Sequence, residues 1–189
     1  MARTLSEMVP LGTSAPHFDL PIANPDVDGK SASKRSLEDS ADALALVIVF
    51  SCNHCPYVHS VEPRLIQLAR EYQQRGVAFV VISANDADQY PADSFDEMAK
   101  RAQNLSYPFP YLYDETQEVA EAYRAVCTPD FFVFDQDRKL AYRGRMDDGR
   151  PGHEASTQEL SEALDSILAG REVPGEQLAS MGCGIKWRH

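Results

Sequence analysis

Apolar residues recur along the chain in short runs that predict alternating strands and helices. The run at 44–50 is uninterrupted and predicts a strand buried on both faces, as at the centre of a parallel sheet. From Val58 to Tyr72, apolar residues return every three or four positions, which indicates one buried helix face. Pro63 predicts a kink in this helix or a regular start near that residue. The run at 77–82 predicts a second buried strand.

The second half of the chain predicts three more helices and a β-hairpin. Capping patterns predict helix starts at 94–97, 114–117 and 156–159. Strands over 131–134 and 139–145 flank a polar turn, so we expect them to pair antiparallel. Glycine and proline in 171–189 predict an irregular tail. Strand–helix alternation followed by a hairpin predicts an α/β fold with a central mixed sheet flanked by helices.

Length and charge limit the number of domains and the classes of partner. The 189 residues suit one domain, 1–189, with an N-terminal extension over 1–40 and a C-terminal tail over 171–189. The net charge of −11 argues against nucleic acid and anionic membranes as partners. Neither a signal peptide nor a stretch of transmembrane length is recognisable, so we expect a cytoplasmic protein with mostly reduced thiols.

Cys52 and Cys55 form a Cys-x-x-Cys pair between the first predicted strand and the first long helix. A pair with this spacing can close a small disulfide ring, and a helix N-terminus favours a thiolate. We therefore expect Cys52 to be the ionised, accessible nucleophile. Cys55 is expected to be the more buried, resolving thiol.

The strand–CxxC–helix at 44–75 and the Thr128-Pro129 pair before a strand resemble the thioredoxin-like superfamily. In that superfamily a cis-proline faces the dithiol and helps to dock the substrate, a position that Pro129 matches. A closer resemblance, to small bacterial thioredoxin-like or AhpC/TSA-like redoxins, covers nearly the whole chain. It rests on the segments 50–57 (FSCNHCPY), 111–123 (YLYDETQEVAEAY), 128–131 (TPDF) and 182–187 (GCGIKW).

The resemblance implies a thiol–disulfide oxidoreductase in which Cys52 attacks, Cys55 resolves the mixed disulfide, and Thr128 and Pro129 bind the substrate. Protein or small-molecule thiols and disulfides are the expected partners, with a dithiol reductase or glutathione exchanging electrons. We expect no bound cofactor and no metal. The oligomeric state is not predicted.

His54 lies inside the Cys-x-x-Cys ring and could support the Cys52 thiolate. The C-x-H-C motif resembles that of strongly oxidising periplasmic dithiol oxidases, so we expect a more oxidising site than Cys-Gly-Pro-Cys; the alternative is an exposed, uncoupled histidine. Thioredoxin has a buried carboxylate six residues before its first cysteine, where this chain has Leu46. Proton transfer would then pass to His54, Glu62 or water, or be absent.

A thiol peroxidase is the second hypothesis. Peroxiredoxins carry Pro-x-x-x-Thr/Ser-x-x-Cys, in which the hydroxyl helps to orient the peroxide. Ala45 and Val49 stand at these positions before Cys52, and Ile48 and Cys52 itself stand there before Cys55. The peroxide-binding hydroxyl is therefore missing from the motif, and we rank this activity below disulfide exchange.

A copper or zinc carrier is a third, weaker hypothesis, resting on the two cysteines with His54, His59 and the distant His153. Adjacent His54 and Cys55 would share one tetrahedral site with difficulty.

Position in the chain predicts a role or location for four more residues. Cys127 is a possible additional redox thiol, although a buried filler is favoured. Cys183 is expected to be structural and Trp187 to anchor the tail. Arg143 is expected on a solvated edge.

Overall fold

The computed structural model describes residues 3–29 and 31–188. Strands cover Arg3–Leu5 (β1), Asp19–Pro21 (β2), Lys34–Ser36 (β3), Ala45–Ser51 (β4), Val77–Ser83 (β5), Tyr111–Tyr113 (β6), Cys127–Thr128 (β7), Asp130–Phe134 (β8), Leu140–Gly144 (β9) and Met181–Gly184 (β10). Helices cover Leu37–Ser40 (η1), Pro56–Gln73 (α1), Pro91–Asp93 (η2), Phe95–Asn104 (α2), Glu118–Tyr123 (α3) and Glu159–Leu168 (α4).

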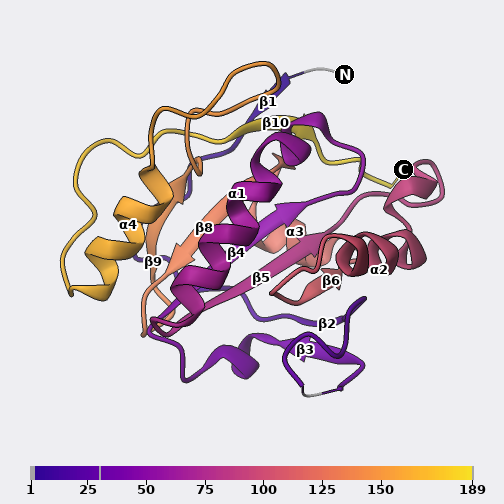
Figure 1. Cartoon of the computed structure of the whole chain (residues 1–189), viewed down its shortest axis with the longest axis horizontal. Coiled ribbons are helices and arrows are strands. Elements are labelled where there is room, and N and C mark those ends of the chain that lie inside the picture. The colour runs from indigo at the N-terminus through magenta and orange to yellow at the C-terminus, as the bar shows by residue number, and fades with distance from the viewer. Residues whose placement is uncertain (1–2, 30, 189) are drawn as a thin grey trace.

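A five-stranded sheet in the order β6-β5-β4-β8-β9 forms the centre of the molecule (Figure 1). Strands β4, β5 and β6 run parallel, whereas β8 pairs antiparallel with both β4 and β9. Helices α1 and α2 make the crossovers that parallel neighbours require. The predicted mixed sheet flanked by helices is therefore confirmed.

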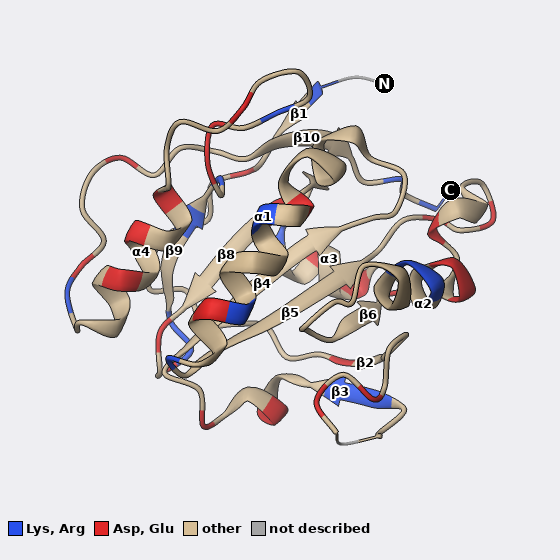
Figure 2. Cartoon of the chain, in the orientation of Figure 1, with Lys and Arg blue, Asp and Glu red and all other residues tan. Residues whose placement is uncertain are grey.

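Strand β4 divides the core into two layers because its side chains alternate between the two faces of the sheet. Ala45, Val47 and Val49 pack with residues of α1, α2 and α4. The intervening residues, among them Phe50, pack with α3, β2 and Trp187. Trp187 thus holds the tail against the domain, as predicted. In Figure 2 both β4 and β5 are free of charged residues, in keeping with their central position.

The C-terminal tail is more regular than predicted. Strand β10 lies between β1 and β7, antiparallel to both, and Figure 1 shows it beside β1. Cys183 faces Thr128 across the β10–β7 pair. The tail therefore returns to the segment that carries Pro129.

One of two alternatives for α1 is wrong, and so is the placement of Arg143. Helix α1 begins at Pro56 and continues through Pro63, which rules out a regular start near Pro63, while the kink at Pro63 stays a prediction. Arg143 does not lie on a solvated edge: it is fully buried, and its guanidinium binds both carboxylate oxygens of Asp130, at 2.5 and 2.9 Å. An alternating pattern cannot reveal a buried arginine whose partner lies on the neighbouring strand.

Among the described residues, no helix is both long and apolar enough to cross a bilayer.

Candidate active site

The Cys-x-x-Cys segment joins the end of β4 to the start of α1. Cys55 is the N-cap of α1 and Pro56 is its first residue, so Cys55, not Cys52, lies at the helix start. Both thiols are free and buried, with Cys52 1% exposed and Cys55 fully covered. The expected open access to Cys52 is therefore wrong for this conformation.

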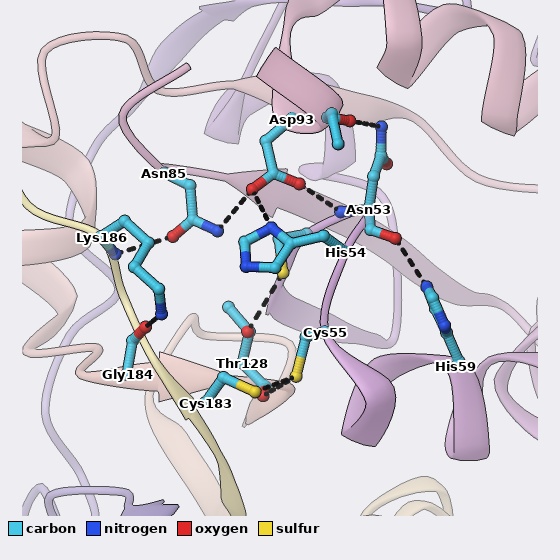
Figure 3. Close-up of polar contacts among 12 residues, drawn as sticks. Asn53, His54, Cys55, His59, Asn85, Asp93, Thr128, Cys183, Gly184 and Lys186 are labelled. Carbon is cyan, nitrogen blue, oxygen red and sulfur yellow. Dashed lines mark hydrogen bonds and ion pairs between the residues drawn. The ribbon is translucent and has the colours of Figure 1, made fainter. Parts of the chain in front are cut away.

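The last residue of β7, Thr128, contacts both sulfurs. The Thr128–Pro129 peptide bond is cis. The hydroxyl of Thr128 is hydrogen-bonded to Cys52 Sγ at 3.4 Å, and its carbonyl oxygen lies 3.2 Å from Cys55 Sγ (Figure 3). Thr128 therefore contacts both members of the dithiol, one through its side chain and one through its backbone.

Cys183 brings a further thiol into the site. Its sulfur lies 2.9 Å from Cys55 Sγ, and Cys183 is 3% exposed (Figure 3). Cys127 is also buried, but its Sγ contacts the carbonyl of Pro129 at 3.9 Å. Burial raises the pKa of the Cys127 thiol, which suits the filler interpretation.

Hydrogen bonding decides which sulfur holds negative charge. The thiol of Cys52, then Cys183 and the backbone N–H groups of Val58 and Cys183, stabilise a Cys55 thiolate against burial and lower its pKa to about 4. The same bond to Cys55, burial and the charge of Asp93 raise the pKa of Cys52. These shifts favour negative charge on Cys55 over Cys52 in this closed arrangement, and the role of Cys52 as the attacking thiolate stays a prediction.

His54 is held by a buried carboxylate that the sequence pattern does not indicate. Its Nδ1 donates to Asp93 Oδ2 at 2.6 Å (Figure 3). Its ring stacks on that of Tyr90, with 5.2 Å between the ring centres. Asp93 also accepts from the backbone N–H of Asn53, at 2.7 Å, and from Asn85 Nδ2, at 2.8 Å. His54 is thus not an exposed histidine, its Nε2 has no hydrogen-bond partner in the described part of the chain, and its coupling to the Cys52 thiolate stays a prediction.

The Asp93 network extends to the C-terminal tail. Asn85 Oδ1 accepts from the backbone N–H of Lys186 at 2.8 Å, and the Lys186 ammonium lies 5.6 Å from the centre of the Tyr90 ring. The tail therefore reaches the site twice, once through Cys183 and once through Lys186.

The residues that could hold a metal differ from the set inferred from the sequence. Ligand atoms of Cys52, His54 and Asp93 lie within 4.8 Å of one another. His59 instead donates to the backbone oxygen of Asn53 at 2.6 Å, and His153 lies near Asp148, at 3.8 Å. The proposed set with His59 and His153 therefore does not assemble.

The structure also distinguishes among the residues considered for proton transfer. Leu46 is buried in the apolar core. Glu62 is held by the Arg101 guanidinium at 2.6 and 2.9 Å and by the hydroxyl of Tyr107. His54, whose ring lies beside Cys52, is the better placed group.

Sequence reasoning missed Asp93 and Asn85 and undervalued Cys183. Asp93 lies 39 residues after His54, in a short 3-10 helix, and its local sequence indicates only the cap of α2. For Cys183 a signal was present, because the GCGIKW segment carries a cysteine between two glycines. Its contact with Cys55 depends on the return of β10, which local periodicity does not reveal.

Comparison with known proteins places this site in a family. The model of the AhpC/TSA family matches residues 11–143. No curated protein matches the chain. An uncharacterized conserved protein from Geobacillus kaustophilus shares 50% identity with a TM-score of 0.92, covering 100% of this chain and 97% of its own.

Two further solved structures are similar. A hypothetical protein from Sinorhizobium meliloti shares 38% identity at a TM-score of 0.91, with 98% of both chains covered. Peroxidoxin BcpB from Mycobacterium tuberculosis has a TM-score of 0.57 at 20% identity, over 84% of this chain and 94% of its own, which shows the shared thioredoxin-like fold alone. The family model matches more than half of this chain, and the matched part includes the buried dithiol and the cis-proline. This chain therefore belongs to the AhpC/TSA family.

Proposed function

We propose that this redox thiol protein is a thiol–disulfide oxidoreductase that works through Cys52 and Cys55. The observation that carries the proposal is the contact of both sulfurs with Thr128 of the cis-proline loop. This contact holds the two sulfurs beside one residue, Thr128, in a spacing of the chain that can close a disulfide ring.

In the proposed reaction Cys52 loses its proton to Cys55 or to Nε2 of His54 and attacks one sulfur of a substrate disulfide. The other substrate sulfur leaves as a thiolate, and Cys52 becomes part of a mixed disulfide. The first leaving thiolate takes up the proton that Cys52 lost, so Cys55 is a thiolate when it attacks Cys52 Sγ, breaks the bond to the substrate sulfur and releases the second substrate thiolate. The substrate gains two electrons, and the chain is left with a Cys52–Cys55 disulfide that glutathione or a dithiol reductase reduces again.

Substrate binding is proposed at the hollow beside the cis bond. This hollow is lined by Tyr57, Pro129, Arg145 and Met181, among others. In the present conformation the register position opposite Thr128 is filled by Cys183, so a substrate strand would pair with Thr128 only after β10 moves. Cys52 must also become exposed before a protein disulfide can reach it.

A thiol peroxidase is the second candidate, and two observations favour it: the AhpC/TSA family itself and the Thr128 hydroxyl at Cys52. This hydroxyl supplies the group that is missing from the local motif. In peroxiredoxins a later arginine also orients the peroxide. Arg143 is not free for this role, because its guanidinium binds both carboxylate oxygens of Asp130.

Reduction of insulin disulfides and of hydrogen peroxide, each driven by a thiol reductant, separates the two candidates. Disulfide exchange predicts that Cys52→Ser and Cys55→Ser both abolish insulin reduction and that peroxide is consumed slowly. Fast peroxide consumption by Cys55→Ser, with little insulin reduction by the wild type, would instead establish the peroxidase.

A further inference from the structure

Cys55 has a potential disulfide partner on each side. Cys52 contacts the same Thr128 as Cys55, and the sulfur of Cys55 lies 2.9 Å from that of Cys183. A disulfide bond measures about 2.05 Å. A movement of about one ångström would therefore bring Cys55 and Cys183 to bonding distance.

The position of Cys183 is fixed by its strand. Cys183 faces Arg3 of β1 on one side and Thr128 of β7 on the other. Gly182 makes this packing possible, because a Cβ at this position would lie 1.9 Å from the carbonyl oxygen of Thr128. Beyond the strand, Lys186 is held by Asn85. The Cys183 thiol is therefore held at the dithiol by contacts on both sides of β10.

Burial distinguishes this contact from an accidental surface pair. Cys183 packs with Cys52, Cys55 and Val58 in a small apolar cluster of its own. Cys127, although close in the sheet, directs its sulfur to the carbonyl of Pro129. The chain thus offers one cysteine suited to exchange with Cys55 and a second, equally buried, as a natural control.

We propose that Cys183 is a third redox thiol, which exchanges with the Cys52–Cys55 disulfide and holds the oxidised state as a Cys55–Cys183 disulfide. This inference rests on the proposed function of the dithiol. The Cys183 thiolate attacks Cys55 Sγ, the Cys52–Cys55 bond breaks, and Cys52 leaves as a thiolate that takes the proton lost by Cys183. One disulfide replaces another, so no electrons are gained or lost and no further reactant is needed.

The exchange has a structural consequence. With a Cys52–Cys55 disulfide, only strand pairing and side-chain contacts hold β10 in place. No covalent bond then prevents β10 from moving away from β7. A Cys55–Cys183 disulfide ties β10 covalently to the start of α1 and keeps it opposite Thr128. The position of the disulfide thus determines whether the substrate edge can open, and it returns Cys52 as a free thiol.

Disulfide mapping in the Cys52→Ser variant tests the proposal. The reduced variant is treated with one equivalent of diamide, which takes two hydrogens per disulfide formed, and is then alkylated, denatured and digested with trypsin. Cys55, Cys127 and Cys183 fall in separate tryptic peptides, 36–64, 125–138 and 172–186. We expect more than half of the monomeric product to carry peptide 36–64 linked to peptide 172–186.

Matched variants complete the test. Cys52→Ser combined with Cys127→Ala should retain the link, whereas Cys52→Ser combined with Cys183→Ala should lose it. Wild-type protein oxidised with glutathione disulfide should show the same linked peptides, and Cys183→Ala should show only the disulfide within 36–64. Circular dichroism of each reduced variant checks folding.

Different results would contradict the role of Cys183 and the oxidoreductase function. A free Cys55 thiol, a link from 36–64 to 125–138, or dimers alone in the Cys52→Ser experiment would overturn the role of Cys183. Insulin reduction by the wild type is measured separately, so its absence would remove the proposed function without affecting the mapping result.

Discussion

Nδ1 of His54 donates to Oδ2 of Asp93 over 2.6 Å, so a carboxylate 39 residues away orients the imidazole beside Cys52. This bond fixes the tautomer, and Nε2 is buried without a hydrogen-bond partner among the described residues. We predict that Nε2 exchanges a proton with Cys52. The pair resembles the base and orienting group that activate nucleophiles in other enzymes. It also explains why an acidic residue is buried at this point in the chain.

Asp93→Asn should slow thiol–disulfide exchange at neutral pH about tenfold or more, because the amide can hold the ring without stabilising its charge. The exchange rate should fall, and the shape of its dependence on pH should also change. A merely structural role for Asp93 would not change that shape. Asp88→Asn, at an exposed side chain near the same loop, serves as the control. Equal profiles for wild type and Asp93→Asn would show that the carboxylate takes no part in proton transfer.

His54→Pro should lower the reduction potential of the dithiol, measured by equilibrium with glutathione. A group that stabilises the reduced form raises the potential, and its removal reverses the effect; about 30 mV corresponds to about 1.4 kcal/mol. His17→Asn, at an exposed and distant histidine, should leave the potential unchanged. An unaltered potential in His54→Pro would remove the idea that this histidine makes the site oxidising.

The reduced protein should contain one thiolate well below neutral pH. Hydrogen bonds from Cys52 and Cys183 lower the pKa of Cys55 to about 4, so its thiolate forms above about pH 4 and is lost as pH falls through that value. Ultraviolet absorbance of the thiolate should show this step in the wild type but not in Cys55→Ser.

The same shift predicts how stability depends on pH. Between about pH 4 and the ordinary cysteine pKa, the unfolded chain binds the proton that folded Cys55 has released. The free energy of unfolding of the reduced wild type should therefore rise with pH across this window, relative to Cys55→Ser. If the free energy of unfolding depended on pH in the same way in both proteins, Cys55 would not be the residue that carries the thiolate.

Gly182→Ala should loosen β10. Its Cβ would overlap the carbonyl oxygen of Thr128, so we expect a loss of about 1–3 kcal/mol in stability and faster alkylation of Cys52 and Cys55. Gly184→Ala is the matched control, because its Cβ would meet the side-chain hydroxyl of Thr4 at 3.2 Å and the carbonyl oxygen of Val126 at 3.8 Å, without overlap. Similar alkylation rates in both variants would show that β10 does not control access.

The sequence predicts the elements whose side chains repeat locally. The buried run of β4, the helical face of α1 and the β8–β9 hairpin all follow from patterns within a few residues. The relationships that build the site join distant segments, such as Asp93 with His54 and Cys183 with Cys55. Local patterns cannot reveal these contacts, and for the same reason they placed Arg143 at a solvated edge.

The most direct test of the central proposal is a trapping experiment with glutathione disulfide. In Cys55→Ser the resolving thiol is absent, so we expect one glutathione per chain to accumulate as a mixed disulfide on Cys52, identified by mass spectrometry of peptide 36–64. In Cys52→Ser no stable adduct should form on that peptide. Accumulation on Cys55 in Cys52→Ser, with none on Cys52 in Cys55→Ser, would contradict the proposed roles of the two thiols.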